Sequence, residues 1–240
     1  MAGVTYRGLD PRTALARWGL PAIAIGITLG VTVPVVLLGL AAVWGGNRES
    51  LPWLLERVFA FLAYLAMTGS VVYGLMLSTK ILDAIAHRPI SFSLHQDLAS
   101  VGLGLAAVHG ALLGLDHSVP FSVAQILVPG LAPHAPVAVA FGQVSLYLSA
   151  IVIASFYVRR RIGQRAWRTL HYVTFLAFLG ATVHGVAAGS DSSSPWAQWL
   201  YLGSAVVVTF LLVYRIAMSM ATRAARPSAR PAPAAIARQA

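Results

Sequence analysis

The chain has 240 residues, of which 58% are hydrophobic and only 10% are charged, and its formal net charge is +10. About a quarter of the residues are charged in an average soluble domain, so this composition excludes an ordinary soluble protein and a disordered one. It indicates an integral membrane protein, and the absence of cysteine excludes disulfides, cysteine-held iron–sulfur clusters and thiol catalysis.

Six apolar runs of at least 18 residues without Asp, Glu, Lys or Arg predict an all-α membrane protein with six transmembrane helices. In chain order, the runs are 20–46, 58–79, 98–115, 137–158, 170–189 and 196–214. The predicted organisation is a cytoplasmic N-terminal segment (1–19), a six-helix domain (20–221) and a disordered tail rich in Ala, Pro and Arg (222–240).

The basic residues predict the orientation of these helices. If the N-terminus lies in the cytoplasm, 15 of the 17 Lys and Arg residues fall in cytoplasmic segments, and only Arg48 and Arg57 fall outside. Cytoplasmic loops of membrane proteins carry this excess of positive charge. We therefore expect both termini in the cytoplasm and a multi-pass location in a bacterial-type plasma membrane.

The outer segment 116–136 is apolar and contains four prolines, so we expect a cap or short re-entrant piece on the outer face. His117 and His134 lie in it, beside Asp116, and are candidates to bind an acceptor metal ion or to line a quinone pocket. An ordinary surface loop is the favoured interpretation. His87, in a cytoplasmic loop, receives no role.

Four histidines lie in or at the ends of two predicted helices. His95 and His109 are 14 residues apart on the third helix, and His171 and His184 are 13 apart on the fifth. Both helices run outward, so His95 can face His171 near the cytoplasm and His109 can face His184 near the outer face. Ionisable groups inside a membrane are costly and usually functional, and haem iron accepts two axial imidazoles. The pattern predicts two stacked b-type haems, each held by two histidines.

Two details accompany this hypothesis. Small residues on the histidine faces are expected to leave a groove for a macrocycle: Ala99, Gly102, Ala106, Ala177 and Gly180. A spacing of 13 residues turns an ideal helix so that His171 and His184 point about 140° apart. The fifth helix must then present two sides, or the two haems must differ in azimuth.

Arg165 and Arg168 lie at the cytoplasmic entrance of the fifth helix, and Arg168 precedes His171 by three residues on the same face. We expect one of the two arginines to pair with a propionate of the inner haem. The alternative is that both arginines only set the membrane orientation.

The segments "HQDLASVGLGLAAVHG" (95–110) and "WRTLHYVTFLAFLGATVHG" (167–185) resemble the ferric reductase-like transmembrane domain family. This family includes the membrane parts of ferric reductases and NADPH oxidases and the haem subunit of the bacterial methionine sulfoxide reductase system. The resemblance covers about residues 20–220. It implies six helices, with His95, His109, His171 and His184 as the ligands of two haem b groups.

Many relatives in that family continue into FAD- and NADPH-binding domains, whereas a short Arg/Pro-rich tail follows the sixth helix here. The expected function is therefore that of an electron-transfer subunit of an oxidoreductase. Its electrons would come from a separate flavoprotein, which carries any flavin, or from a membrane quinol, and would go to an acceptor of unknown identity at the outer face. No nucleic-acid partner is expected, and no side chain is predicted to act as an acid–base or nucleophilic catalyst.

The alternative from another class is a haem-free transporter or proton channel that uses the intramembrane histidines as a relay. Such a protein would favour carboxylates within the spans, and Asp97 is the only acid expected near a span interior.

Overall fold

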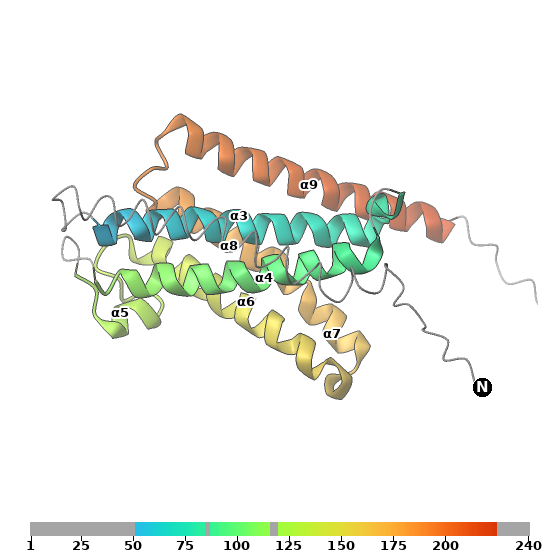
Figure 1. The fold of residues 1–240 in the computed structure, drawn as a ribbon, viewed down its shortest axis with the longest axis horizontal. Helices are drawn as coiled ribbons and strands as arrows, with labels where there is room; N and C mark the ends of the chain where they lie inside the picture. The colour runs from blue at the N-terminus through green and yellow to red at the C-terminus, as the bar shows by residue number, and fades with distance from the viewer. Residues whose placement is uncertain (1–50, 85–86, 116–119, 225–240) are drawn as a thin grey trace, which may run out of the picture.

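A computed structural model describes residues 51–84, 87–115 and 120–224 (Figure 1). All regular structure within these ranges is helical, which confirms the predicted class for this part of the chain. The elements are α3 (Leu51–Thr79), the 3₁₀ helix η3 (Ile81–Ala84), α4 (Arg88–Leu112), α5 (Val123–Leu127), α6 (Pro136–Ile162), α7 (Gln164–His171), α8 (Val173–Ala188) and α9 (Pro195–Ala224). The first predicted span (20–46), the segment 1–19 and the tail from residue 225 lie outside the described residues.

Four helical stretches in the described ranges are long and apolar enough to cross a membrane: Pro52–Thr79, Pro136–Ile162, Gln164–Ala188 and Pro195–Thr222. They correspond to the second, fourth, fifth and sixth predicted spans. Helix α4 has 25 residues, or about 38 Å at 1.5 Å per residue. It is not among the four, because His95, Gln96 and Asp97 make its first half polar.

Three helical stretches begin well before the apolar runs predict. Helix α3 begins at Leu51 rather than at residue 58, α4 begins at Arg88 rather than at residue 98, and α7 begins at Gln164 rather than at residue 170. Pro89 in the first turn of α4 suits a helix start, since the first backbone N–H groups have no partner within the helix. His95 and Glu56 therefore lie inside helices, so the expectation that Asp97 is the only acid near a span interior is wrong.

The helices lie in pairs along the long axis of the molecule (Figure 1). Helix α4 packs along α3, α8 packs along α6, and α9 packs against α3. A core of buried side chains forms between α3, α8 and α9: Tyr64, Val71, Leu75, Phe178, Ala197, Tyr201, Val208 and Leu211. The outward faces are apolar as well, with Tyr157 77% exposed and Phe210 67% exposed. Exposed apolar area of this extent suits a lipid environment rather than water.

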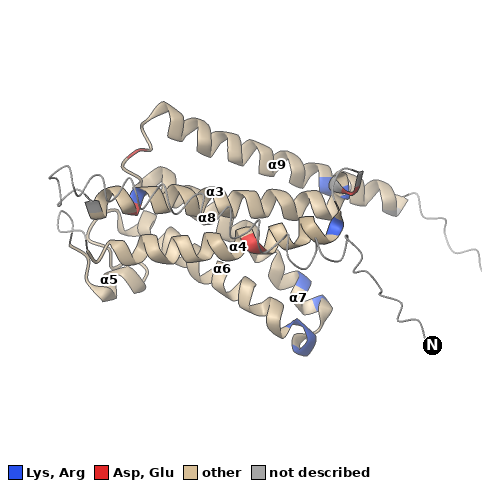
Figure 2. Ribbon diagram, in the orientation of Figure 1, with Lys and Arg blue, Asp and Glu red and all other residues tan. Residues whose placement is uncertain are grey.

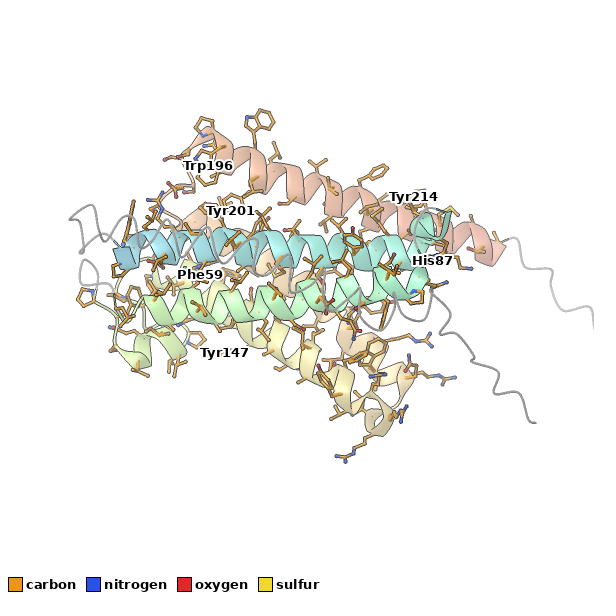
Figure 3. The ribbon with its side chains drawn as sticks, viewed as in Figure 1. Phe59, His87, Tyr147, Trp196, Tyr201 and Tyr214 are labelled. Atoms are coloured by element: carbon orange, nitrogen blue, oxygen red, sulfur yellow. The ribbon has the colours of Figure 1, made fainter. Side chains whose placement is uncertain are left out.

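Charge is distributed unevenly along the bundle. Lys and Arg residues gather at the end formed by the α3–α4 connection, the α6–α7 turn and the second half of α9 (Figure 2). His87 lies at this basic end, whereas Trp196 lies at the opposite end (Figure 3). At the α6–α7 turn the chain reverses through Gly163, whose φ of 83° is a left-handed conformation that favours glycine.

The expected outer cap contains the short helix α5, which is held against α6. Ser122 caps its N-terminus by accepting a hydrogen bond from the backbone N–H of Gln125. The Gln143 amide of α6 donates to the carbonyls of Gln125 and Ile126 at 2.8 Å each. The Tyr147 hydroxyl (Figure 3) donates to the carbonyl of Leu127, so polar groups of α6 satisfy carbonyls near the end of α5.

Arg57, the described basic residue at the end opposite the basic one, is paired. Its guanidinium forms an ion pair with Asp191, in the turn between α8 and α9, and lies 4.0 Å from the centre of the Trp53 ring. The two charged side chains are only 22% and 16% exposed. This pair therefore ties the α8–α9 turn to α3 and offsets the positive charge of Arg57.

We expect Asp191→Asn to lower the free energy of unfolding by about 1–2 kcal/mol, because it removes a charge-assisted bond from a partly buried arginine. The matched control is Asp83→Asn, which removes an exposed pair with Arg88 (N–O 3.4 Å) and should cost less than about 1 kcal/mol. Thermal unfolding of the purified protein in detergent, followed by circular dichroism, compares the two. Equal losses of stability would contradict the structural role of Asp191.

Candidate functional site

The four predicted histidines meet in two pairs. The ring centroids of His95 (α4) and His171 (the last residue of α7) are 6.1 Å apart. Those of His109 (α4) and His184 (α8) are 6.2 Å apart. The pairing by depth that the parallel helices predicted is thus present. At 1.5 Å per residue the pairs are roughly 20 Å apart along α4.

Three of the four imidazoles are fixed by backbone carbonyl groups of neighbouring helices. The Nδ1 atoms of His95, His109 and His184 donate to the carbonyls of Ser70 (2.8 Å), Glu56 (3.0 Å) and Ala138 (3.0 Å), respectively. A carbonyl oxygen only accepts, so in each ring Nδ1 carries the hydrogen and Nε2 keeps its lone pair in the neutral form. Metal-binding histidines are oriented in this way.

Ser70 of α3 both accepts a hydrogen bond from His95 and donates one to it. While its carbonyl accepts from Nδ1, its hydroxyl donates to the His95 carbonyl at 3.0 Å and lies 3.1 Å from Nδ1. The Ser70 side chain is buried. The position of the inner imidazole is therefore set by α3 as well as by its own helix.

The fifth predicted helix is broken near Tyr172. The break accounts for how two histidines 13 residues apart can both face α4. Helix α7 ends at His171 and α8 begins at Val173. Around Tyr172 the hydrogen bonds tighten to the i→i+3 pattern, from Tyr172 N–H to the Thr169 carbonyl (3.2 Å) and from Phe175 N–H to the Tyr172 carbonyl (3.1 Å). His171 and His184 thus lie on separate helices, and each faces its own partner on α4.

Two neighbouring contacts support this break. The Thr174 hydroxyl donates to the His171 carbonyl at 2.7 Å, the kind of back-bonding that bends helices. From α9, the guanidinium of Arg215 donates to the Tyr172 hydroxyl at 3.3 Å. Side chains of α8 and α9 therefore both contact the residues at the break.

Glycines leave the space that two of the rings occupy. A Cβ atom on Gly142 of α6 would lie 2.7 Å from His184 Cγ, closer than non-bonded atoms approach. A Cβ atom on Gly74 of α3 would lie 3.1 Å from His95 Cε1. One helix neighbouring each of these rings thus lacks a side chain where the imidazole lies.

The expected macrocycle groove along the small residues is not found at its two glycines. A Cβ atom on Gly102 would lie 3.2 Å from the backbone nitrogen of Met67, because α3 and α4 approach closely there. A Cβ atom on Gly180 would meet the Ser145 hydroxyl of α6. These glycines serve close helix packing, which is the more common role of small residues in membrane helices.

The remaining candidates that the structure describes are exposed. Arg165 and Arg168 are exposed on α7, and no hydrogen bond or ion pair of either guanidinium occurs within the described residues. His134 is exposed on the outer loop, and His87 is exposed at the start of α4. His117 and Asp116 lie outside the described residues.

The donor set fits a haem better than a metal ion held by protein alone. Among the described residues, no three His, Cys, Asp or Glu side chains gather as a metal site. A metal bound between two imidazoles must take its other ligands from elsewhere, as iron does from a porphyrin. Imidazole–metal bonds of about 2 Å, with roughly 1 Å from each nitrogen to its ring centre, place the two centroids about 6 Å apart. Both pairs have this separation.

Glu56 is a further residue near the outer pair. One of its carboxylate oxygens lies 3.8 Å from His109 Nδ1, in addition to the carbonyl contact. The predicted helix start at residue 58 placed Glu56 outside the membrane span. A negative charge beside a ligating imidazole raises its basicity, so this contact would favour metal binding.

No protein-family model, curated protein or solved structure matches the chain.

Proposed function

We propose that the protein is a membrane b-type cytochrome, similar to the ferric reductase-like transmembrane domains, that carries electrons across the bilayer. In this proposal it has six transmembrane helices and cytoplasmic termini, and it binds two haem b groups. It acts as the electron-transfer subunit of an oxidoreductase whose donor, a flavoprotein or quinol, is separate. The observation that carries the proposal is that the four imidazoles form two matched pairs. In three of the four rings, Nε2 is left free.

When bound, each haem supplies an iron that cycles between the ferric and ferrous states and so accepts and releases one electron. His95 and His171 hold the inner group, and His109 and His184 hold the outer one. Ser70, Glu56 and Ala138 keep three of the rings in the ligating tautomer through their carbonyls. Arg168 remains a candidate partner for an inner propionate, since its long exposed side chain lies one turn from His171.

The basic end of the bundle supports the orientation. Positive charge is retained on the cytoplasmic side of membrane proteins, and the His95–His171 pair lies toward this end. An electron donor on the cytoplasmic side would therefore meet the inner pair first. The outer pair lies toward the end of α5 and of the Arg57–Asp191 ion pair.

The test is a reduced-minus-oxidised optical spectrum of the full chain purified in detergent, with haem and protein quantified on the same sample. We expect a b-type spectrum and two haems per chain. A preparation grown with ample haem that shows no haem band would refute the cytochrome and favour the histidine-relay channel. Proton flux into vesicles containing that preparation would then identify the channel directly.

A further inference from the structure

Four buried side-chain atoms have no hydrogen-bond partner within the described residues: Thr68 Oγ1, Ser91 Oγ, Gln143 Oε1 and Trp167 Nε1. Two of these, the Ser91 hydroxyl and the Trp167 indole N–H, are donors beside the inner histidine pair. Ser91 is only 2% exposed. A buried donor without an acceptor costs roughly 1–3 kcal/mol, so each of these positions calls for an acceptor that the described residues do not supply.

The two donors occupy equivalent places on either side of the pair. Ser91 precedes His95 by four residues on α4, and Trp167 precedes His171 by four residues on α7. Residues four apart lie on the same face of a helix, one turn from each other. Both donors are therefore one turn closer to the basic end than the imidazoles.

Aromatic contacts link the helix segments that carry the two donors. The Trp167 ring stacks on His171 with a centroid distance of 5.3 Å and an interplanar angle of 28°. Trp167 also lies 6.3 Å from Phe156 of α6. Phe156 also lies 6.3 Å from Phe92, the residue that follows Ser91. The Phe156 ring thus contacts aromatic residues of both α4 and α7, closer to the basic end than the inner pair.

Anionic or carbonyl oxygens are the strongest acceptors for these two donors. A haem carries two propionates on one edge, and their charge is least costly when that edge faces the basic, water-facing end of the bundle. An indole N–H only donates, so the basic side chains at that end cannot satisfy it. Two propionates match the two unpartnered donors in number, in chemistry and in direction.

We propose that the Trp167 indole N–H and the Ser91 hydroxyl each donate a hydrogen bond to a propionate of the inner haem. This inference rests on the proposed function. Both are positioning residues: they fix the rotation of the porphyrin about the axis between His95 and His171 and draw negative charge away from the iron. Their loss leaves more charge on the propionates, which favours the ferric state and lowers the midpoint potential of the inner haem.

The test uses Trp167→Phe, Ser91→Ala and the double variant of the full-length protein in detergent. Ser91→Ala removes little beyond the hydroxyl, whereas Trp167→Phe removes the indole N–H together with part of the ring that stacks on His171. The Ser91 variant therefore tests the lost donor separately from lost packing. The matched controls are Trp199→Phe, at an indole that is 71% exposed, and Ser100→Ala, at an exposed hydroxyl that donates within α4. Redox titration gives the two midpoint potentials, and transfer of haem to excess apomyoglobin gives the dissociation rates.

We expect both single variants to bind two haems, with a lower potential for the inner haem and an unchanged outer one. The inner haem should dissociate roughly tenfold faster than in the wild type, the size expected for one lost hydrogen bond to a charged group. Variants that match their controls in both readouts would overturn the inference, as would equal shifts at both haems. The proposed function fails separately, if the wild-type protein itself binds no haem.

Discussion

Replacing His109 or His184 with alanine should remove one and the same haem, so that each variant keeps half of the wild-type haem absorbance. In the proposed cytochrome, each imidazole would supply one of two protein ligands at its site, and the ring centroids of the two pairs are 6.1 and 6.2 Å apart. Loss of either ring leaves a site with a single ligand. His95→Ala and His171→Ala should likewise each lose the other haem.

Double variants make this prediction sharper. The variant lacking both His109 and His184 should still bind one haem, because both changes affect the same site. The variant lacking His109 and His171 should bind none. Pyridine haemochrome quantification on purified protein measures these ratios, and His87→Ala and His134→Ala, at exposed positions, are controls that should keep two haems. Loss of both haems from the His109/His184 variant would show that the pairs are not independent sites.

Gly142→Ala should disable the outer site selectively. The added methyl group would lie 2.7 Å from His184 Cγ and 2.8 Å from Nδ1, so the ring must leave its place or α6 must move away. Either movement breaks the bond from Nδ1 to the Ala138 carbonyl. Overpacking of this kind costs about 1–3 kcal/mol. We expect the outer haem to be lost or strongly shifted in potential, while the inner haem keeps its spectrum.

The matched substitution is Gly104→Ala on α4. Its Cβ atom meets nothing within 4 Å, so the change should leave both haems intact and slightly favour the helix. Gly74→Ala is an intermediate case, because its Cβ atom would lie 3.1 Å from His95 Cε1 and should disturb the inner haem instead. The prediction fails if Gly142→Ala and Gly104→Ala give the same spectra and potentials.

The meeting of the histidines was predictable because two ordinary signals combine. Apolar runs gave the helices, and the basic residues gave their direction, which made the third and fifth helices parallel. Spacings of 14 and 13 residues on parallel helices then matched His95 to His171 and His109 to His184. Apolar length also predicted the four helices that can cross a membrane.

Other features had no such signal in the sequence. The break at Tyr172 depends on where Thr174 and Arg215 lie in space, and periodicity assumes an unbroken helix. Gly102 and Gly180 were assigned to a groove because sequence shows that a residue is small but not which neighbour it faces. The unpartnered donors of Ser91 and Trp167 become visible only once burial and hydrogen bonds are known. In hindsight, their shared spacing of four residues from a histidine was the available clue.

Three of the histidine rings are held by backbone carbonyls, and this affects which mutations the protein tolerates. Every amino acid supplies a backbone carbonyl, so side-chain changes at Ser70, Glu56 or Ala138 leave the acceptor of the imidazole hydrogen bond in place. Only a change in helix register or a kink would remove it. We therefore expect a genetic screen for lost haem to find the histidines and Gly142 repeatedly and to pass over Ala138. Sequences that share this arrangement can therefore differ at Ala138, whose side chain makes none of these contacts, and their common chemistry would be recognised from geometry rather than from residue identity.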